Sequence, residues 1–205
     1  MVAGLLTDEA CMERLQQGQT EALDELYQRY ARKLYAFCHN TLRSSKPHAA
    51  EDLVQDVFVR VIKGAHTFDP RKASFRTWLF RIARNRCLDV IRREKLVRMI
   101  PIGGRARQPD GAERLAREDT LADQDQDLER MAMRTVAVEA VRACVEEIDD
   151  VEERQAIVLY YLGGKVYREI GEILGRSTGT ARNRVQSAQD KIRRCLEGKG
   201  IHSPP

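Results

Sequence analysis

The strongest candidate for binding chemistry is a basic stretch that runs from Arg71 to Arg98. It holds ten basic residues against two acidic ones, Asp89 and Glu94. An ordinary solvated helix face mixes both signs of charge, whereas a face of one sign favours a polyanionic partner such as nucleic acid. The ten cations are Arg71, Lys72, Arg76, Arg81, Arg84, Arg86, Arg92, Arg93, Lys95 and Arg98.

Three aromatic residues stand within or just after the loop that leads into this stretch: Phe68, Phe75 and Trp78. Single-stranded nucleic acid is held by aromatic stacking together with cations that follow its backbone. The loop therefore suits an unpaired base. The alternative is that Phe75 and Trp78 belong to a core, and for Trp78 the helical spacing favours the core.

A second group of polar residues lies in the segment YREIGEILGRSTGTARNRVQSAQDKIRR. It has the layout of a helix-turn-helix: a short helix, a turn at Gly175 and a longer helix. Arg pairs with guanine and Asn or Gln with adenine in the major groove, while a plain helical hairpin is the alternative. The candidates for base contact are Thr180, Arg182, Asn183, Arg184 and Gln186.

Catalytic and metal-binding patterns are weak by comparison. Gly175 to Gly179 fits the G-x-S-x-G template, but a nucleophile elbow needs a preceding strand, and no strand pattern exists in the chain. Ser177 is better interpreted as a helix cap. The histidines and cysteines lack zinc-ligand spacing. We expect no enzyme activity, cofactor or metal site, and the five cysteines are interpreted as small buried residues or idle thiols.

Helical periodicity predicts helices over residues 7–16, 20–42, 47–64 and 74–98, which together form a first domain over 7–97. Ser74 is the predicted cap of the last of these. The helix over 47–64 buries a regular apolar stripe and exposes a mostly acidic side. That side carries Glu51, Asp52, Gln55, Asp56 and Arg60.

Composition then shifts. Glycine, proline and a run of acidic residues predict a flexible linker over 98–130. Four helices follow in a second domain over 131–197, and 198–205 form a loose tail. The predicted fold is all-α, with two small helical domains joined by the linker. No apolar run spans a bilayer and the start lacks a basic n-region, so we expect a cytoplasmic protein without membrane insertion.

At this point the chain resembles a known family. AAEDLVQDVFVRVIKGAHTFDPRKASFRTWLFRIARNRCLDVIRR resembles the second conserved region of bacterial sigma factors of the extracytoplasmic-function (ECF) type, within the sigma-70 family. VEEIDDVEERQAIVLYYLGGKVYREIGEILGRSTGTARNRVQSAQDKIRR resembles their fourth region. The two segments occur in the family's order, with a linker between them.

The resemblance implies a function: binding core RNA polymerase and directing promoter-specific transcription initiation, with promoter DNA as the second partner and an anti-sigma factor as an inhibitor. It assigns polymerase docking to Asp52, Gln55, Asp56 and Phe58. It assigns minus-ten recognition and DNA melting to Phe68, Arg71, Lys72, Arg76, Arg81, Arg84, Asn85 and Arg92. It assigns minus-thirty-five recognition to Arg182, Asn183, Arg184 and Gln186, beside Thr180. The acidic linker would thread the RNA path of the polymerase.

Departures from the family pattern are few. Family members commonly carry basic residues where this chain has Ser187 and Gln189, which predicts weaker phosphate contacts. The usual Leu-Pro before Glu-Arg is Asp150-Val151 here. One alternative is a conventional helix-turn-helix regulator that binds duplex DNA as a dimer, which would need a dimerisation face. The other is a small nuclease, which would need clustered carboxylates or histidines.

Overall fold

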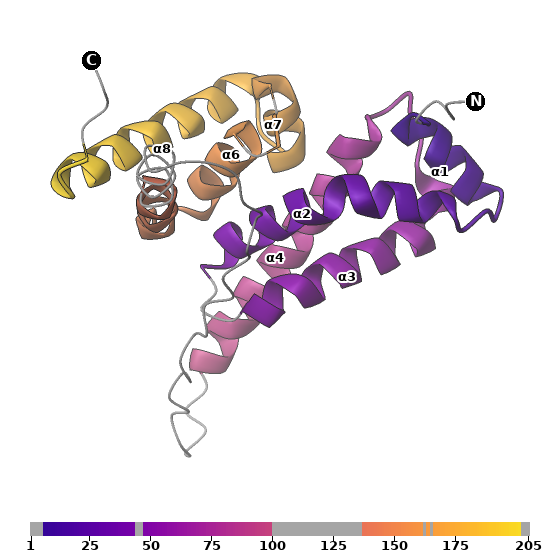
Figure 1. Cartoon of the computed structure of the whole chain (residues 1–205), viewed down its shortest axis with the longest axis horizontal. Helices are drawn as coiled ribbons and strands as arrows, with labels where there is room; N and C mark the ends of the chain where they lie inside the picture. Colours follow the sequence, from indigo (N-terminus) through magenta and orange to yellow (C-terminus); the bar gives the residue numbers. More distant parts are fainter. Residues whose placement is uncertain (1–5, 44–46, 100–136, 162, 165, 202–205) are drawn as a thin grey trace, which may run out of the picture.

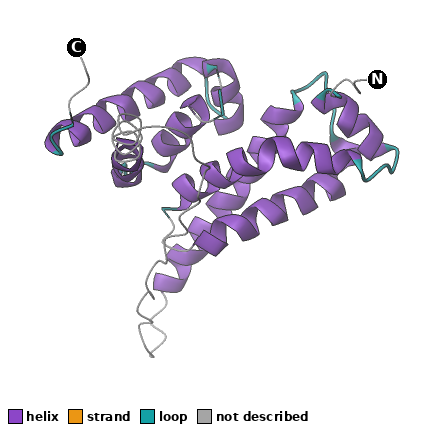
Figure 2. Ribbon diagram, viewed as in Figure 1, coloured by secondary structure: helices purple, strands orange, loops and turns teal. Residues whose placement is uncertain are grey.

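The computed structural model describes residues 6–43, 47–99, 137–161, 163–164 and 166–201. Every regular element among these residues is a helix, and none of them forms a strand (Figure 2). The all-α prediction is therefore confirmed. The linker expected over 98–130 falls almost wholly outside the described residues, as does the end of the tail.

The first part of the chain folds as four α-helices and one short 3₁₀ turn. Three of these α-helices contact one another pairwise, and the first packs against two of them and the turn. The observed ends agree with the predicted ones to within about two residues, as expected for strongly periodic segments. The elements are α1 (Asp8–Gln16), α2 (Ala22–Leu42), α3 (Pro47–Gly64), η1 (Ala65–Thr67) and α4 (Phe75–Met99).

Side-chain caps define where α1 and α4 begin. The Thr7 hydroxyl accepts from the backbone N–H of Ala10 at 3.2 Å, and the Ser74 hydroxyl accepts from that of Thr77 at 3.2 Å. Each cap satisfies a backbone donor that the first turn of a helix leaves without a partner. The Ser74 cap confirms the start predicted for the basic helix.

The core of this part is aromatic and aliphatic. Phe37 and Phe80 meet edge to face at 5.4 Å between ring centroids, and Phe75 is fully buried. Helical spacing alone places Thr77 on the outer face of the basic helix and Ile62 in the apolar stripe of the helix over 47–64, and both of these predictions are wrong. Thr77 is 1% exposed and Ile62 is 46% exposed. Helix α4 packs against α1, α2, α3 and α7, so it buries a wider face than one stripe.

The second part contains a helix over residues 137–147, then α6 (Val151–Tyr161), α7 (Tyr167–Leu174) and α8 (Thr178–Gly198). Helical spacing predicts one buried face from Val138, Val141, Val145 and Ile148, but only Val145 and Ile148 are buried, and Val138 and Val141 are exposed. The predicted cap at Ser177 is confirmed, since its hydroxyl accepts from the backbone N–H of Thr180 at 3.1 Å.

The turn between α7 and α8 depends on two glycines. Gly175 has a φ of +63°, a left-handed conformation that glycine adopts without a steric penalty. Gly171 lets the turn approach helix α7, because a Cβ there would lie 2.8 Å from the carbonyl oxygen of Arg176. At this close approach the backbone N–H of Arg176 donates a hydrogen bond to the carbonyl oxygen of Gly171 at 2.8 Å.

The cysteines divide into two groups. Cys11, Cys38 and Cys87 are free and buried, in agreement with their interpretation as small core residues. Cys144 and Cys195 form a disulfide with their Cα atoms 5.8 Å apart, which corrects the expectation of idle thiols. Their separation of 51 residues in sequence hid the pair, because helix packing alone brings them together.

The two parts of the chain pack against each other (Figure 1). Helix α2 contacts α6, and α4 contacts α7, so the buried residues form one continuous cluster. Helix α1 lies at the far end of the first part in Figure 1. None of the helices described is both long and apolar enough to cross a membrane.

The close approach at Gly171 generates a stability prediction. Gly171→Ala should lower the free energy of unfolding by about 1–3 kcal/mol, because the added methyl group meets a backbone carbonyl that cannot move aside. Chemical denaturation of the two chains measures the difference. Gly198→Ala is the matched control, since no atom lies within 4 Å of the added Cβ there. Equal stability of the two variants would contradict the prediction.

Candidate nucleic-acid and polymerase interfaces

The loop before α4 is held from inside by its aromatic residue. Phe68 is 6% exposed and packs against Trp78 at 5.4 Å and against Phe75 at 6.1 Å between ring centroids. Its ring therefore supports the loop in this arrangement and does not offer a face to a base. Trp78 is half-buried beside it, in agreement with the core interpretation.

Two cations of the loop face solvent. The side chains of Arg71 and Lys72 are 89% and 83% exposed. Asp69 orders them: its carboxylate accepts from the Arg71 guanidinium and from the Arg71 backbone N–H, both at 3.0 Å. These hydrogen bonds hold the pKa of Asp69 below its usual value, so the turn stays charged and closed. Farther along α4, Asn85 and Arg92 are also exposed.

Arg76 lies deeper. Its Nε donates to the Tyr30 hydroxyl at 3.4 Å, and that hydroxyl in turn donates to Asp8 of α1. Burial, followed by the hydrogen bond to Asp8, raises the pKa of Tyr30 to about 12, so the phenol stays protonated. Asp8 also pairs with Arg29 at 2.9 Å. Arg76 is thus part of an internal network that joins α1, α2 and α4.

Arg81 and Arg84 point at the second part of the chain. Arg81 donates from Nε to the carbonyl oxygen of Glu172 in α7 at 2.8 Å. Arg84 lies 3.7 Å from a carboxylate oxygen of Glu152 in α6. Burial lowers the pKa of Arg84, whose Nε is buried without a hydrogen-bond partner. Arg81 remains exposed while it makes this hydrogen bond, whereas the Arg84 side chain is largely covered.

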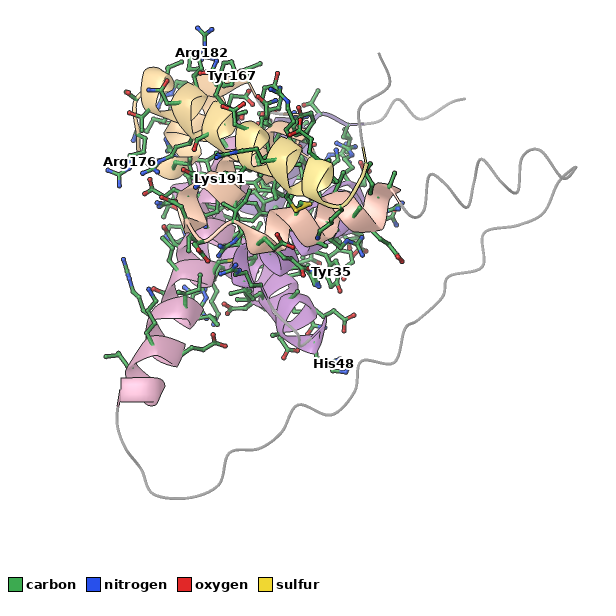
Figure 3. All side chains as sticks on the ribbon, turned by 90° about the vertical axis from the view of Figure 1, so that its left-hand side faces the viewer. Tyr35, His48, Tyr167, Arg176, Arg182 and Lys191 are labelled. Carbon is green, nitrogen blue, oxygen red and sulfur yellow. A yellow bond between two sulfur atoms is a disulfide. The ribbon has the colours of Figure 1, made fainter. Side chains whose placement is uncertain are left out.

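Helix α8 exposes three of its five candidate residues: Arg182, Asn183 and Gln186. Figure 3 shows Arg182 pointing away from the ribbon near the start of α8. Thr180 is half-buried, and its hydroxyl lies 2.9 Å from that of Ser177 at the cap. A helix start with exposed Arg, Asn and Gln has the side chains that read base edges in a major groove.

Arg184 differs from its neighbours on α8. It lies 2.8 Å from Asp150, 3.5 Å from Glu152 and 3.7 Å from Glu153, the acidic residues around the start of α6. In the sequence, these acidic residues stand only where one predicted helix ends and the next begins. Their convergence on one arginine depends on how α6 and α8 cross, which periodicity does not define.

The two departures from the family pattern also face inward. The Ser187 hydroxyl donates to Glu153 at 3.0 Å, and the Gln189 amide donates to the Tyr161 hydroxyl at 2.6 Å. Lys191 pairs with the other carboxylate oxygen of Glu153. Ser187 and Gln189 therefore contribute to packing between α6 and α8 in this structure.

The residues assigned to polymerase docking separate into two kinds. Asp52 and Gln55 are exposed on α3. Phe58 is 4% exposed, with its ring 4.9 Å from that of Tyr27. Asp56 accepts from Arg60 at 3.2 Å and from Arg86; burial opposes its charge, but these hydrogen bonds hold its pKa below the usual value.

The sequence interpretation missed three exposed apolar side chains near Asp52 and Gln55. Two of them lie on α3, and the third lies on the neighbouring helix α2. Tyr27 and Val59 are each 44% exposed, and Ile62 is 46% exposed. An exposed apolar group rimmed by polar residues is typical of a protein-binding surface. Helical spacing was the available signal for Val59, because it lies four residues after Gln55 and seven after Asp52 and so shares their exposed side of α3.

No cluster of three or more metal-ligating side chains occurs in the described part of the chain. A shallow hollow lies beside the loop before α4. It is lined by Gln16 of α1 and by the residues from His66 to Lys72. Its lining includes the Gln16 amide, the Asp69 carboxylate and the cations Arg71 and Lys72, while the Phe68 ring is packed on Trp78, so the groups it offers are mostly polar.

Two family models match the chain: Sigma-70 region 2 over residues 26–97, and Sigma-70, region 4 over residues 139–192. The ECF RNA polymerase sigma factor SigE of Mycolicibacterium smegmatis is 31% identical over 173 residues, which are 84% of this chain and 61% of that longer protein. The ECF RNA polymerase sigma factor RpoE of Cereibacter sphaeroides is 30% identical over 175 residues, 85% of this chain and 86% of that protein.

Solved structures share the fold. The sigma factor RpoE of Bartonella quintana, solved with the anti-sigma factor NepR, has a TM-score of 0.64 and 22% identity, covering 85% of this chain and 96% of that one. CnrH, solved with the cytosolic domain of CnrY, has a TM-score of 0.62 and 22% identity, covering 93% and 97%. With two family regions matched in order and relatives at this level of identity, the chain belongs to the ECF RNA polymerase sigma factors of the sigma-70 family.

Proposed function

We propose that this sigma factor docks on core RNA polymerase through α3, opens promoter DNA with the loop and helix α4, and reads the minus-thirty-five element with α8. The observation that carries the proposal is the start of α8. There Arg182, Asn183 and Gln186 are exposed directly after a glycine turn of the helix-turn-helix type.

For the minus-ten element, the accessible polar residues are three cations and one asparagine, in the loop and on the outer face of α4. Arg71, Lys72, Asn85 and Arg92 are free to approach a phosphate backbone in the arrangement described. The remaining assigned residues hold internal contacts: Phe68, Arg76, Arg81 and Arg84. Release of Arg81 and Arg84 to DNA requires the second part of the chain to move away from α4. Arg76 would instead have to leave Tyr30, and Phe68 needs a change in the loop.

For the polymerase, we propose that Asp52 and Gln55 make the polar contacts and that Tyr27, Val59 and Ile62 supply apolar area. Asp56 and Phe58 act indirectly, because the first is paired with Arg60 and Arg86 and the second is buried under Tyr27. A surface with both kinds of group is suited to a helical partner such as a coiled coil.

The setting follows from these partners. A factor that binds RNA polymerase and promoter DNA works in the bacterial cytoplasm, and none of the steps proposed here needs a cofactor, a metal or a catalytic residue. Relatives of the same fold have been solved with an anti-sigma factor or a cytosolic partner domain. We therefore propose that an anti-sigma factor controls this chain as well.

Run-off transcription with purified core polymerase tests the proposal. A library of promoter fragments should yield transcripts that start at defined sites only when this chain is added. A chain that binds duplex fragments equally well without polymerase, and gives no promoter-specific transcript, would instead support a conventional helix-turn-helix regulator.

The docking surface has its own test. Asp52→Lys should weaken binding to core polymerase at least about tenfold, because a reversed charge at a complementary interface costs several kcal/mol. Co-purification and a titration by fluorescence anisotropy measure the affinity. Glu13→Lys, an equally exposed reversal on α1, should leave it unchanged. Equal affinities for Asp52→Lys and wild type would refute the assignment.

The arrangement around α8 separates two arginines. Arg182→Ala should cost about 1–3 kcal/mol of binding to the preferred promoter and little on other sequences if Arg182 reads a base. Arg184→Ala should instead reduce the stability of the chain, because it leaves Asp150, Glu152 and Glu153 without a shared cation. Competition binding and thermal unfolding give the two readouts, and a uniform loss on all sequences for Arg182→Ala would limit its role to phosphate contact.

A further inference from the structure

Helix α1 lies outside the residues matched by the region 2 model, which begins at residue 26. Nothing in its composition suggests a role beyond packing, since one face is buried through Cys11, Met12 and Leu15. Its polar residues, however, reach the loop between η1 and α4 at both ends. Figure 1 shows α1 beside the start of α4, at the end of the first part that carries this loop.

The first contact is at the start of the loop. The Gln16 side-chain amide donates from Nε2 to the carbonyl oxygens of Ala65 and Phe68, at 2.9 and 3.0 Å. A primary amide has two N–H groups, so both are used here. The chain leaves the 3₁₀ turn at Phe68 in an extended conformation, with φ −71° and ψ 127°. Gln16 therefore defines the direction in which the loop departs.

The second contact is at the end of the loop. A carboxylate oxygen of Glu9 lies 3.3 Å from the backbone nitrogen of Phe75 and accepts its N–H. This donor belongs to the first turn of α4, where helix geometry supplies no partner, and a carboxylate there is also favoured by the helix dipole. Glu9 and the Ser74 cap together define where α4 begins.

Between these two ties, the loop presents its functional groups. Arg71 and Lys72 are its exposed cations, and the hollow beside them is lined by Gln16 and the loop itself. A short loop held at both ends loses little conformational entropy when a ligand binds, which raises affinity without adding a contact.

We propose that α1 is a brace that sets the loop for capture of unpaired promoter DNA, with Gln16 as the main positioning residue and Glu9 as the second. The inference rests on the proposed minus-ten function of the loop. It requires that removing the Gln16 amide impairs strand opening while duplex recognition by α8 stays intact.

The experiment uses the full chain with core polymerase on the promoter that the run-off library yields. Permanganate reactivity of unpaired thymines reports opening, and anisotropy on a duplex fragment that ends upstream of the minus-ten element reports recognition by α8. Gln16→Ala should reduce opening about tenfold, the effect of losing one to two net hydrogen bonds, with duplex binding within about twofold of wild type. Glu9→Ala should act in the same direction.

Gln17→Ala is the matched control, because Gln17 is the neighbouring exposed amide and its side chain makes no contact with the loop in the described structure. It should open DNA like the wild type. Gln16→Lys restores a donor near the two carbonyls and should recover part of the opening.

Three outcomes decide the matter. Equal opening by Gln16→Ala and Gln17→Ala overturns the brace. If Gln16→Ala lowers the stability of the whole chain, Gln16→Lys decides: a stable Gln16→Lys chain that still fails to open DNA also overturns it. A wild-type chain that opens no promoter would instead refute the minus-ten function on which the inference rests.

Discussion

One carboxylate connects the two proposed DNA-binding surfaces. Glu152, at the start of α6, lies 3.7 Å from Arg84 of the basic helix and 3.5 Å from Arg184 of the recognition helix, and it accepts from Arg176 of the intervening turn at 2.9 Å. Its side chain is 18% exposed, so these charges meet in a medium that screens them less than bulk water does. The arrangement of both halves of the chain depends on this residue, because it neutralises cations that would otherwise repel one another.

Several buried polar groups lie at or beside the contact around Glu152 without a full set of hydrogen bonds. Among the described residues, the buried side-chain polar atoms without a hydrogen-bond partner belong to Thr41, Arg84, Arg154 and Gln155, on α2, α4 and α6, the helices at or beside this contact. Each such atom costs about 1–3 kcal/mol relative to a satisfied one. Arg154 is 2% exposed and donates to the carbonyl oxygen of Thr41 at 3.1 Å, yet burial still lowers its pKa to about 10. An interface that leaves such groups poorly satisfied is less stable than a domain core, so its separation is less costly.

Helix periodicity predicted most of the fold because the helices bury regular apolar stripes, and side-chain caps mark the starts of α1, α4 and α8. The boundaries at Thr7, Ser74 and Ser177 followed from local chemistry alone. The candidate site was predicted less completely. Phe68 and Arg184 carry the residue types that DNA binding needs, but the first is packed on Trp78 and the second on Asp150. Which cations are free depends on contacts between segments far apart in sequence, and residue type and spacing carry no information about those contacts.

The 35 lysines and arginines are nearly balanced by 31 acidic residues, so the net charge is only +4, and part of this balance is made by contacts within the chain. Arg81 meets a neutral backbone carbonyl and Arg84 meets a carboxylate, which carries the same single charge as a phosphodiester; both are acceptors for a guanidinium. Under the proposed function, promoter DNA presents a denser array of anions than α6 and α7 and competes for these arginines, with counterion release as a further gain. The basic helix is partly covered by the chain's own acceptors, and the exposed cations Arg71, Lys72 and Arg182 are those proposed to make the first encounter with DNA.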